Sequence, residues 1–367
     1  MAKKIRLGFV GANVRSTWAS QSHYPALAAS PDVELTAVCT TRTETAEAAQ
    51  KAFGAKLAFT DFRTMVASKE IDAVVVVVRV PLHYEPTKAA IEAGKHVYTE
   101  WPLGRTTAEA EELTALARAK GVQTACGLQS RVSPALLYMK ELIESGYVGE
   151  VLSCHADCMR DGALERPSSR AWQRDVTLGA NPLTIANGHV IDAMRFVVGN
   201  FTRVSCMVTT QAKQWLETDT KKMVDVTSPD NILVSGKLVR GAVASVHVAA
   251  VPWAGGGYRM VIYGREGTLV VTGNVSSQRG ELLRLQGAKR SHELSDMTIP
   301  DRFFWLPPEF PRGDPFNVGH MYALFAEAIR TGQKPQKLPT FDIAVDLHRF
   351  LDKIRQSSDT GRELQVP

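Results

Sequence analysis

Residues 5–16 read IRLGFVGANVRS, and this stretch decides the fold class. Its first part, Ile5–Gly11, is a short apolar run that predicts a buried β-strand. The strand leads directly into a weakened form of the glycine-rich turn Gly-x-Gly-x-x-Gly, whose backbone amides approach a pyrophosphate at the start of a helix. We therefore expect the first strand–helix junction of a dinucleotide-binding domain.

Only the first glycine of that turn is present, at Gly11. Asn13 stands at the second position, where asparagine tolerates a positive φ better than other non-glycine residues, and Ser16 stands at the third. An ordinary strand–helix turn is the alternative interpretation. The place of the turn at the first junction favours a cofactor contact, so Gly11, Asn13, Val14 and Ser16 are predicted to bind the cofactor.

Strand and helix patterns alternate outward from this turn. Further strands are predicted at Val33–Thr40, Ala73–Val78, His96–Thr99 and Val122–Gly127, and helices at Trp18–Ala29, Glu44–Phe53, Tyr84–Ala93 and Thr107–Lys120. Near-continuous apolar strands separated by helices indicate a parallel sheet that is covered on both faces. We expect an α/β fold, with a doubly wound Rossmann domain over residues 1–130.

The pattern changes after a predicted helix at Pro134–Ser145, because strands now follow one another with turns between most of them. They are predicted at Val151–Asp157, Val204–Thr210, Asn231–Leu238, Ala242–Ala250, Tyr258–Gly264, Thr268–Gly273 and Leu282–Gln286. This indicates an open, mostly antiparallel sheet in an α+β domain over residues 131–367. Helices expected to cover its buried face are Leu183–Val198, Phe316–Thr331 and Phe341–Ser357, and the C-terminal helices are also expected to pack back on the Rossmann domain.

Composition sets the broad class. The length of 367 residues suits two domains better than one core. The 43 basic and 38 acidic residues are spread along the chain, so charge does not indicate a nucleic-acid partner. No apolar run approaches the roughly 20 residues that cross a bilayer, and the first residues lack the pattern of a secretion signal. We expect a cytoplasmic protein without a membrane partner.

The five cysteines are an odd number in a chain long enough to fold without disulfides, which favours free thiols in a reducing compartment. Cys154 and Cys158 flank His155, but in a strand they would lie on one face, and no second Cys/His pair completes a zinc site. No metal site is predicted.

The end of the second strand bears on the choice of cofactor. Enzymes that use NAD place an acidic residue there for the ribose 2′-hydroxyl, whereas this sequence has Thr41-Arg42. A guanidinium pairs with a 2′-phosphate and lies on the adenine, while an aspartate would repel that phosphate. We therefore expect NADP(H) to be favoured over NAD(H), with Thr41 and Arg42 in contact with it. A solvated loop residue is the alternative interpretation of Arg42.

The segment Gly94-Lys95-His96-Val97, followed by Glu100 and Pro102-Leu103, resembles the signature of the glucose-fructose oxidoreductase, inositol dehydrogenase and MocA-like family. The resemblance continues through Gln129-Ser130-Arg131, Gly149-Glu150-Val151, Gly188-His189-Val190-Ile191-Asp192 and Pro339-Thr340-Phe341. It implies a Rossmann domain followed by an open sheet that often packs against another subunit, and hence a homodimer or homotetramer through the C-terminal sheet.

The resemblance also implies roles for single residues. Cofactor contacts are expected at Arg79, His83, Glu100 and Gln129, and substrate contacts at Trp101 and Arg131. Two more site residues are predicted from their positions in the sequence. Asp192 lies one helical turn after His189, where it can orient the ring, and Trp172 lies in the polar stretch Arg166–Asp175, for which a surface loop is the alternative interpretation. Family enzymes usually carry a Lys where this chain has Trp101, and an Asp where it has Ile185. Of the three groups that handle the substrate proton, only His189 is present, and it is the predicted acid/base. Packing roles for His189 and Trp101 are the alternative interpretations.

Two functions of different classes follow. The first is an NADP(H)-dependent oxidoreductase that moves a hydride between the nicotinamide and a carbinol or carbonyl carbon of a sugar-like or aryl-substituted small molecule. The second is a catalytically silent NADP(H)-binding regulatory protein that acts through protein contacts, because the loss of Lys and Asp is similar to that in the subgroup of the fungal galactose-regulon repressor. The compact chain, without a long insertion or charged tail, favours the enzyme.

Overall fold

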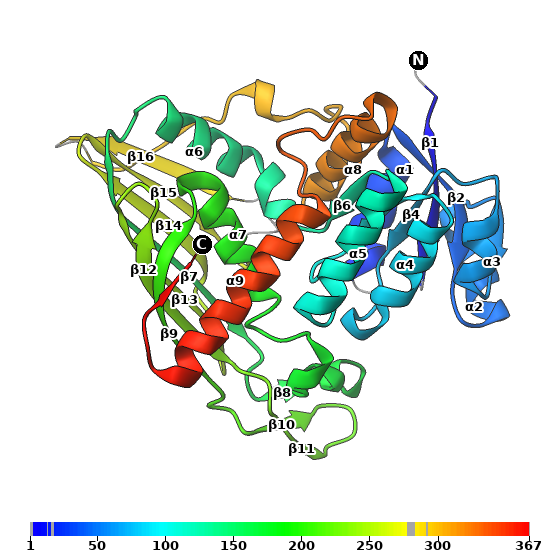
Figure 1. Ribbon diagram of the computed structural model, residues 1–367, viewed down its shortest axis with the longest axis horizontal. Coiled ribbons are helices and arrows are strands. Elements are labelled where there is room, and N and C mark those ends of the chain that lie inside the picture. The colour runs from blue at the N-terminus through cyan, green and yellow to red at the C-terminus, as the bar shows by residue number, and fades with distance from the viewer. Residues whose placement is uncertain (1–2, 13, 16–17, 277–282, 291–292, 367) are drawn as a thin grey trace. The chain divides into compact units, whose positions relative to one another are not determined.

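The computed structural model describes residues 3–12, 14–15, 18–276, 283–290 and 293–366 (Figure 1). The chain forms two compact units. We call residues 1–132 and 305–346 the N-terminal unit, and residues 133–304 and 347–367 the sheet unit. Each unit has its own main sheet.

The N-terminal unit contains a parallel sheet of six strands in the order β3-β2-β1-β4-β5-β6. The strands are β1 Ile5–Val10, β2 Val33–Cys39, β3 Leu57–Phe59, β4 Ala73–Val76, β5 His96–Thr99 and β6 Thr124–Cys126. This is the strand order of a Rossmann sheet, in which the winding direction reverses between β1 and β4. The predicted doubly wound fold is confirmed. The short strand β3 is part of this order, but the sequence pattern did not predict it.

Most helices on this sheet lie within or close to the predicted ranges, but the helix Phe62–Ala67 was not predicted. The helices are α1 Tyr24–Ala29, which follows a π-helical turn at Ala19–His23, α2 Thr43–Phe53, α3 Phe62–Ala67, α4 Tyr84–Glu92 and α5 Thr107–Lys120. Helix α5 shows why its limits were predictable: the Thr106 side chain accepts a hydrogen bond from the Glu109 N–H, and Gly121 ends the helix at a φ of 66°.

Helix α8, Asp314–Thr331, was predicted to cover the antiparallel sheet, and this prediction was wrong. The helix belongs to the N-terminal unit. It contacts α1, β2 and β6 of the N-terminal unit, and lies beside α1 in Figure 1. The composition of the helix explains this position, because it is apolar on more than one side and therefore suits the interior of the Rossmann unit. Its buried apolar residues include Pro315, Phe316, Met321, Tyr322 and Phe325.

The sheet unit contains nine strands in the order β17-β16-β15-β14-β7-β13-β12-β9-β18. They are β7 Val151–Asp161, β9 Phe201–Thr209, β12 Asn231–Leu238, β13 Val243–Val251, β14 Gly257–Gly264, β15 Gly267–Gly273, β16 Arg284–Lys289, β17 Ser295–Asp296 and β18 Leu364–Gln365. Only the β7–β13 pair is parallel among these described strands, so the predicted, mostly antiparallel sheet is confirmed. A small second sheet, which the pattern did not predict, joins β8 Glu165–Arg166, β10 Gln214–Glu217 and β11 Met223–Asp225.

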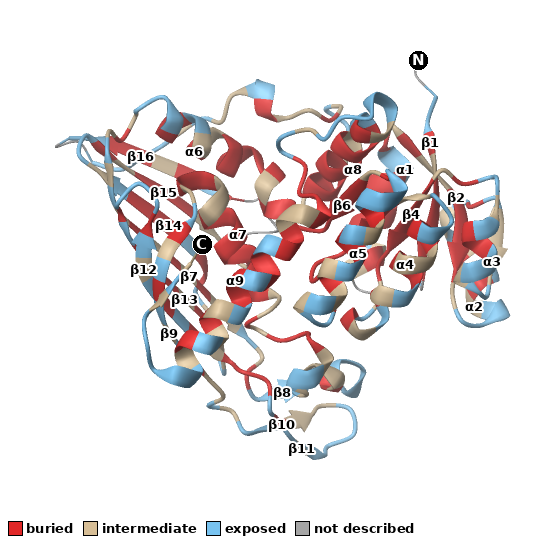
Figure 2. Cartoon of the chain, in the orientation of Figure 1, coloured by how far each residue is buried: buried red, intermediate tan, exposed pale blue. Residues whose placement is uncertain are grey.

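One face of the nine-stranded sheet is buried, as the alternating burial along its strands shows in Figure 2. Helices α6 Pro134–Glu144 and α7 Ala186–Val198 pack on it. The later part of α9, Phe341–Thr360, covers its other end, where the Phe350 ring stacks on Phe201 with centroids 5.3 Å apart. Helix α7 is buried along nearly its whole length, which places its polar side chains in the interior.

The thiols are free, and Cys154 and Cys158 are both buried on one face of β7, as the strand pattern predicted. Across the part of the chain that the structure describes, no cluster of three or more His, Cys, Asp or Glu side chains has the arrangement of a metal site. The described helices include none that is both long and apolar enough to cross a membrane.

Candidate functional site

The turn after β1 lies where the Rossmann sheet reverses its winding. Gly11 has a φ of 95°, and a Cβ on it would lie 2.0 Å from the Val77 carbonyl oxygen, so no other residue fits without moving the end of β4. The N–H groups of Gly11 and Ala12 both point to the Cys39 carbonyl oxygen, at 3.1 and 3.4 Å. The ends of three neighbouring strands are thus held together at the edge where doubly wound folds bind nucleotides.

The other residues predicted to bind the cofactor at this edge are either exposed or outside the described residues. Asn13 and Ser16 lie outside the described residues, while Val14 is exposed. Thr41 and Arg42 are exposed between β2 and α2, and the Arg42 carbonyl oxygen accepts hydrogen bonds from the hydroxyl groups of Thr40 and Thr45. These bonds fix the backbone of Arg42 and leave its guanidinium at the surface, so a contact with a 2′-phosphate stays a prediction.

Glu100, just after β5, is the most heavily hydrogen-bonded side chain of the N-terminal unit that we describe. Its carboxylate accepts from Gln129 Nε2 at 2.8 and 3.1 Å, from Tyr98 Oη at 3.0 Å and from Trp18 Nε1 at 3.0 Å, and it contacts His23 Nε2 at 3.2 Å. The sequence predicted Glu100 and Gln129 as cofactor contacts. The structure brings the two together in a buried cluster, which we call the Glu100 cluster.

The surroundings of Glu100 determine its charge. Burial alone would raise the pKa of this carboxyl, but the hydrogen bonds from His23, Gln129 and Tyr98 outweigh burial and lower the pKa. A Cβ on Gly127 would lie only 2.5 Å from Glu100 Oε1, so a glycine is needed beside the carboxylate. The opposite ring nitrogen of His23, Nδ1, contacts Tyr322 Oη at 2.7 Å, which ties the cluster to α8.

His83 and Trp101 lie near the same strand ends. The two ring nitrogens of His83 contact the carbonyl oxygens of Pro102, at 2.7 Å, and Val78, at 3.1 Å. Burial lowers the pKa of His83, although the two carbonyl contacts act in the opposite direction, and the ring connects the loop after β4 with the loop after β5. Trp101 is 4% exposed, and Arg79 in the loop after β4 is exposed. Their predicted contacts with cofactor or substrate stay predictions.

Helix α7 presents the predicted acid/base. The His189 N–H donates to the Ile185 carbonyl oxygen at 3.1 Å, so His189 lies one helical turn beyond the position where the family has its Asp. His189 and Asp192 are both buried on this helix. Trp172 is half-buried in the 3₁₀ helix Ser168–Arg174, and Arg131 is half-buried in another at Gln129–Val132. Their substrate contacts stay predictions.

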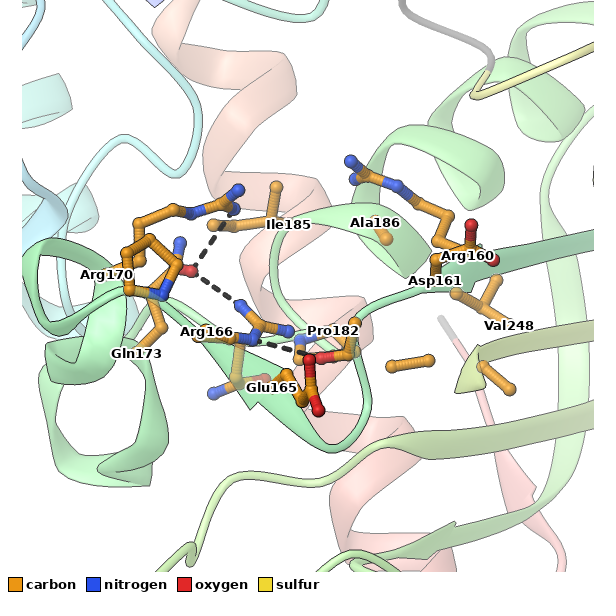
Figure 3. A pocket seen from close by; sticks show the side chains of 15 residues that line it. Arg160, Asp161, Glu165, Arg166, Arg170, Gln173, Pro182, Ile185, Ala186 and Val248 are labelled. Carbon is orange, nitrogen blue, oxygen red and sulfur yellow. Dashed lines mark hydrogen bonds between the residues drawn. The ribbon is translucent and has the colours of Figure 1, made fainter. Parts of the chain in front are cut away.

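A cavity of about 160 Å³ opens in the sheet unit beside the start of α7 (Figure 3). Ile185 and Ala186 form part of its wall, and Arg160, Arg166 and Arg170 also line it. The sequence indicated the polar stretch Arg166–Asp175, but none of these three arginines was predicted as a site residue. Their recurrence between residues 160 and 170 was the available signal, but only the fold shows that they face one cavity.

These features define a Rossmann-type nucleotide-binding protein with an appended α+β unit that carries a polar cavity. Residues 5–128 match the family described as "Oxidoreductase family, NAD-binding Rossmann fold", and residues 134–273 match "Gal80p, C-terminal domain". The chain belongs to the glucose-fructose oxidoreductase, inositol dehydrogenase and MocA family of oxidoreductases.

Its relatives include proteins of two kinds. Dehydrogenase aclE of Aspergillus oryzae is 34% identical over 288 residues, which cover 74% of this chain and 78% of the relative. The galactose/lactose metabolism regulatory protein GAL80 of Saccharomyces cerevisiae is 31% identical over 66% of this chain and 60% of the relative. A structure of levoglucosan dehydrogenase in complex with NADH and levoglucosan has the same fold, with a TM-score of 0.86, 24% identity and 100% of both chains covered.

Proposed function

We propose that the protein is a nicotinamide-dependent oxidoreductase that interconverts a carbinol and a carbonyl group on a sugar-like or aryl-substituted small molecule. The observation that carries this proposal is the cavity of the sheet unit, whose wall includes Ile185 and Ala186 at the start of the helix with His189. A protein that acts only through its outer surface has no need of a polar cavity there. The dehydrogenase among the relatives supports the same function.

Each group has a defined part in this reaction. A bound nicotinamide supplies the hydride acceptor or donor. The turn at Gly11 binds the pyrophosphate, and the Glu100 cluster fixes the loop after β5. His189 accepts the proton of the substrate hydroxyl during oxidation and returns a proton to the carbonyl oxygen during reduction, so that proton and hydride together account for the two electrons and two hydrogens exchanged.

A catalytically silent regulator is the second candidate, because Trp101 and Ile185 replace two family proton-handling groups and because one relative is GAL80. A screen of sugars, glycosides and aryl carbonyls with NADP⁺ and NADPH separates the two. We expect at least one compound to change the absorbance of the nicotinamide. Tight cofactor binding without any turnover across the screen would favour the regulator.

We further propose that NADP(H) is preferred over NAD(H), because the exposed Arg42 stands at the end of β2 where NAD enzymes place an acid. NADP(H) is expected to bind more tightly, and Arg42→Ala is expected to remove most of the difference, about 1–3 kcal/mol for a charge-assisted contact. Titration calorimetry measures both affinities. Lys120→Ala, at the C-terminal end of α5, is a control that should change neither, and equal affinities of the wild type for both cofactors would refute the preference.

Finally, we propose a homodimer through the outer face of the nine-stranded sheet. Leu233 on β12 and its cross-strand neighbour Met207 on β9 are 43% and 57% exposed, and apolar side chains gathered on a sheet face favour a partner. Light scattering is expected to give twice the 40.1 kDa of one chain. The pair Leu233→Lys and Met207→Lys should raise the dissociation constant at least about tenfold.

The control for this prediction is Met223→Lys, because Met223 is 57% exposed on β11 of the small second sheet and not on the nine-stranded sheet. It should leave the mass unchanged. A wild-type protein that remains a monomer at micromolar concentration would rule out the proposed dimer.

A further inference from the structure

Three arginines from neighbouring segments converge on the cavity of the sheet unit. Arg160 lies on β7, Arg166 lies on β8, and Arg170 lies in the following 3₁₀ helix. Figure 3 shows the Arg160 and Arg170 side chains extending from opposite sides toward Ile185 and Ala186. Because the positive charges of Arg160, Arg166 and Arg170 act on one another, placing them around one cavity is unfavourable unless a negative charge binds there.

Protein atoms engage only some of the donors. Arg166 donates from Nε to the Gly162 carbonyl oxygen at 3.3 Å and from Nη1 to Gln173 Oε1 at 2.7 Å, and its guanidinium lies 4.2 Å from the centroid of the Trp215 ring. Arg170 donates from Nη2 to the same Gln173 oxygen at 3.3 Å. Since each guanidinium has five N–H donors, Arg166 and Arg170 keep donors for a ligand.

Carboxylates do not neutralise the group. Asp161 and Glu165 also line the cavity, but, among the described residues, neither forms an ion pair with any of the three arginines. The Asp161 carboxylate instead accepts a backbone N–H. Burial is the main cause that lowers the pKa of Arg166 to about 10, and the charges of Arg170 and Arg160 lower it further.

We propose that Arg160, Arg166 and Arg170 bind an oxyanion of the substrate, a carboxylate or a phosphate. Planar guanidinium groups match both anions through paired N–H donors, and the cavity of about 160 Å³ is large enough for either group. The inference rests on the proposed oxidoreductase function, because it assigns the anion to the molecule that reacts near His189. It narrows the substrate class to acidic or phosphorylated sugar-like compounds.

Calorimetric titration of the full chain, saturated with NADPH, tests this site with glucuronate, glucose 6-phosphate and glucose. At least one anionic sugar is expected to bind about tenfold or more tightly than glucose, and comparison of the two anions distinguishes carboxylate from phosphate. Arg160→Gln and Arg170→Gln are each expected to weaken the anion about 10- to 100-fold, as for loss of a charged hydrogen bond. Glucose affinity should not change.

Arg265→Gln is the matched control, because Arg265 pairs with Glu150 at the surface of the same unit. It should leave anion binding intact. Arg166 also stabilises the segment through Gly162 and Gln173, so the test relies on the other two arginines and on melting curves that show both variants folded.

The two proposals fail in different ways. Anion binding that depends on Arg160 and Arg170 supports the site, even if no compound is turned over in the oxidoreductase screen. Turnover of neutral glycosides, with no binding of either anion or with binding that Arg160→Gln and Arg170→Gln leave unchanged, overturns the anion site and leaves the oxidoreductase standing.

Discussion

Glu100→Ala is expected to lower the free energy of unfolding by about 3–5 kcal/mol, because it removes a buried, hydrogen-bonded charge from its partners. Gln129 Nε2, Tyr98 Oη and Trp18 Nε1 all donate to the Glu100 carboxylate and lose their acceptor. His23 loses the contact with its Nε2. Urea denaturation followed by circular dichroism measures the loss.

Glu47→Ala is the control, because Glu47 is exposed on α2. Its effect should stay within about 0.5 kcal/mol. Glu100→Gln keeps the volume and part of the hydrogen bonding, so its effect should fall between the two. If Glu100→Ala destabilised no more than Glu47→Ala, the Glu100 cluster would not be a source of stability.

The same carboxylate gives a pH dependence with a definite sign. The pKa of Glu100 is lowered in the folded protein, so its contribution is fully present above the ordinary value of 4.5 and is lost as pH falls through the lower, folded value. Denaturation at a series of acidic pH values should therefore show the gap between wild type and Glu100→Gln narrowing below about pH 4.5. A gap that stayed constant over this range would contradict the assignment.

Local sequence signals were sufficient where the periodicity was strong and the termini were capped. Strand Asn231–Leu238 and helix Thr107–Lys120 have the predicted limits, the first through strict alternation and the second through Thr106 and Gly121. No equal signal marked β3 or the small sheet with β8, because these strands have only two to four residues, which is too short to show a clear period. Their pairing depends on what the fold places beside them.

The candidate site divides in the same way. The need for glycine at position 11 was predictable, because the positive φ there belongs to a turn that the neighbouring residues indicate. The role of Glu100 was not, since its partners Trp18 and Gln129 lie 82 and 29 residues away in the chain. The arginine group could not be predicted for a related reason. Arg160, Arg166 and Arg170 line one cavity only because of the way β7 and the segment after it fold, and no short sequence motif indicates this.

His189→Asn is expected to lower turnover by roughly 10²–10⁴-fold, the usual effect of losing a positioned acid/base, while cofactor affinity stays unchanged. The reason is that His189 is the one family proton-handling group kept in a sequence with Trp101 and Ile185 at the other two positions. Steady-state kinetics with the substrate found in the screen measures turnover, and fluorescence titration of NADPH measures affinity. The dependence of the rate on pH that the wild type shows should also be lost in the variant.

Two further variants separate catalysis from packing. His155→Asn, on β7 of the same unit, removes an imidazole that contacts Ser245 and should leave turnover within about twofold. Trp101→Lys restores the usual family residue without the Asp, and because a lysine alone lacks its partner it should not rescue His189→Asn. If His189→Asn reduced turnover no more than His155→Asn does, the proton would have to pass to another group, and His189 would be a packing residue of α7.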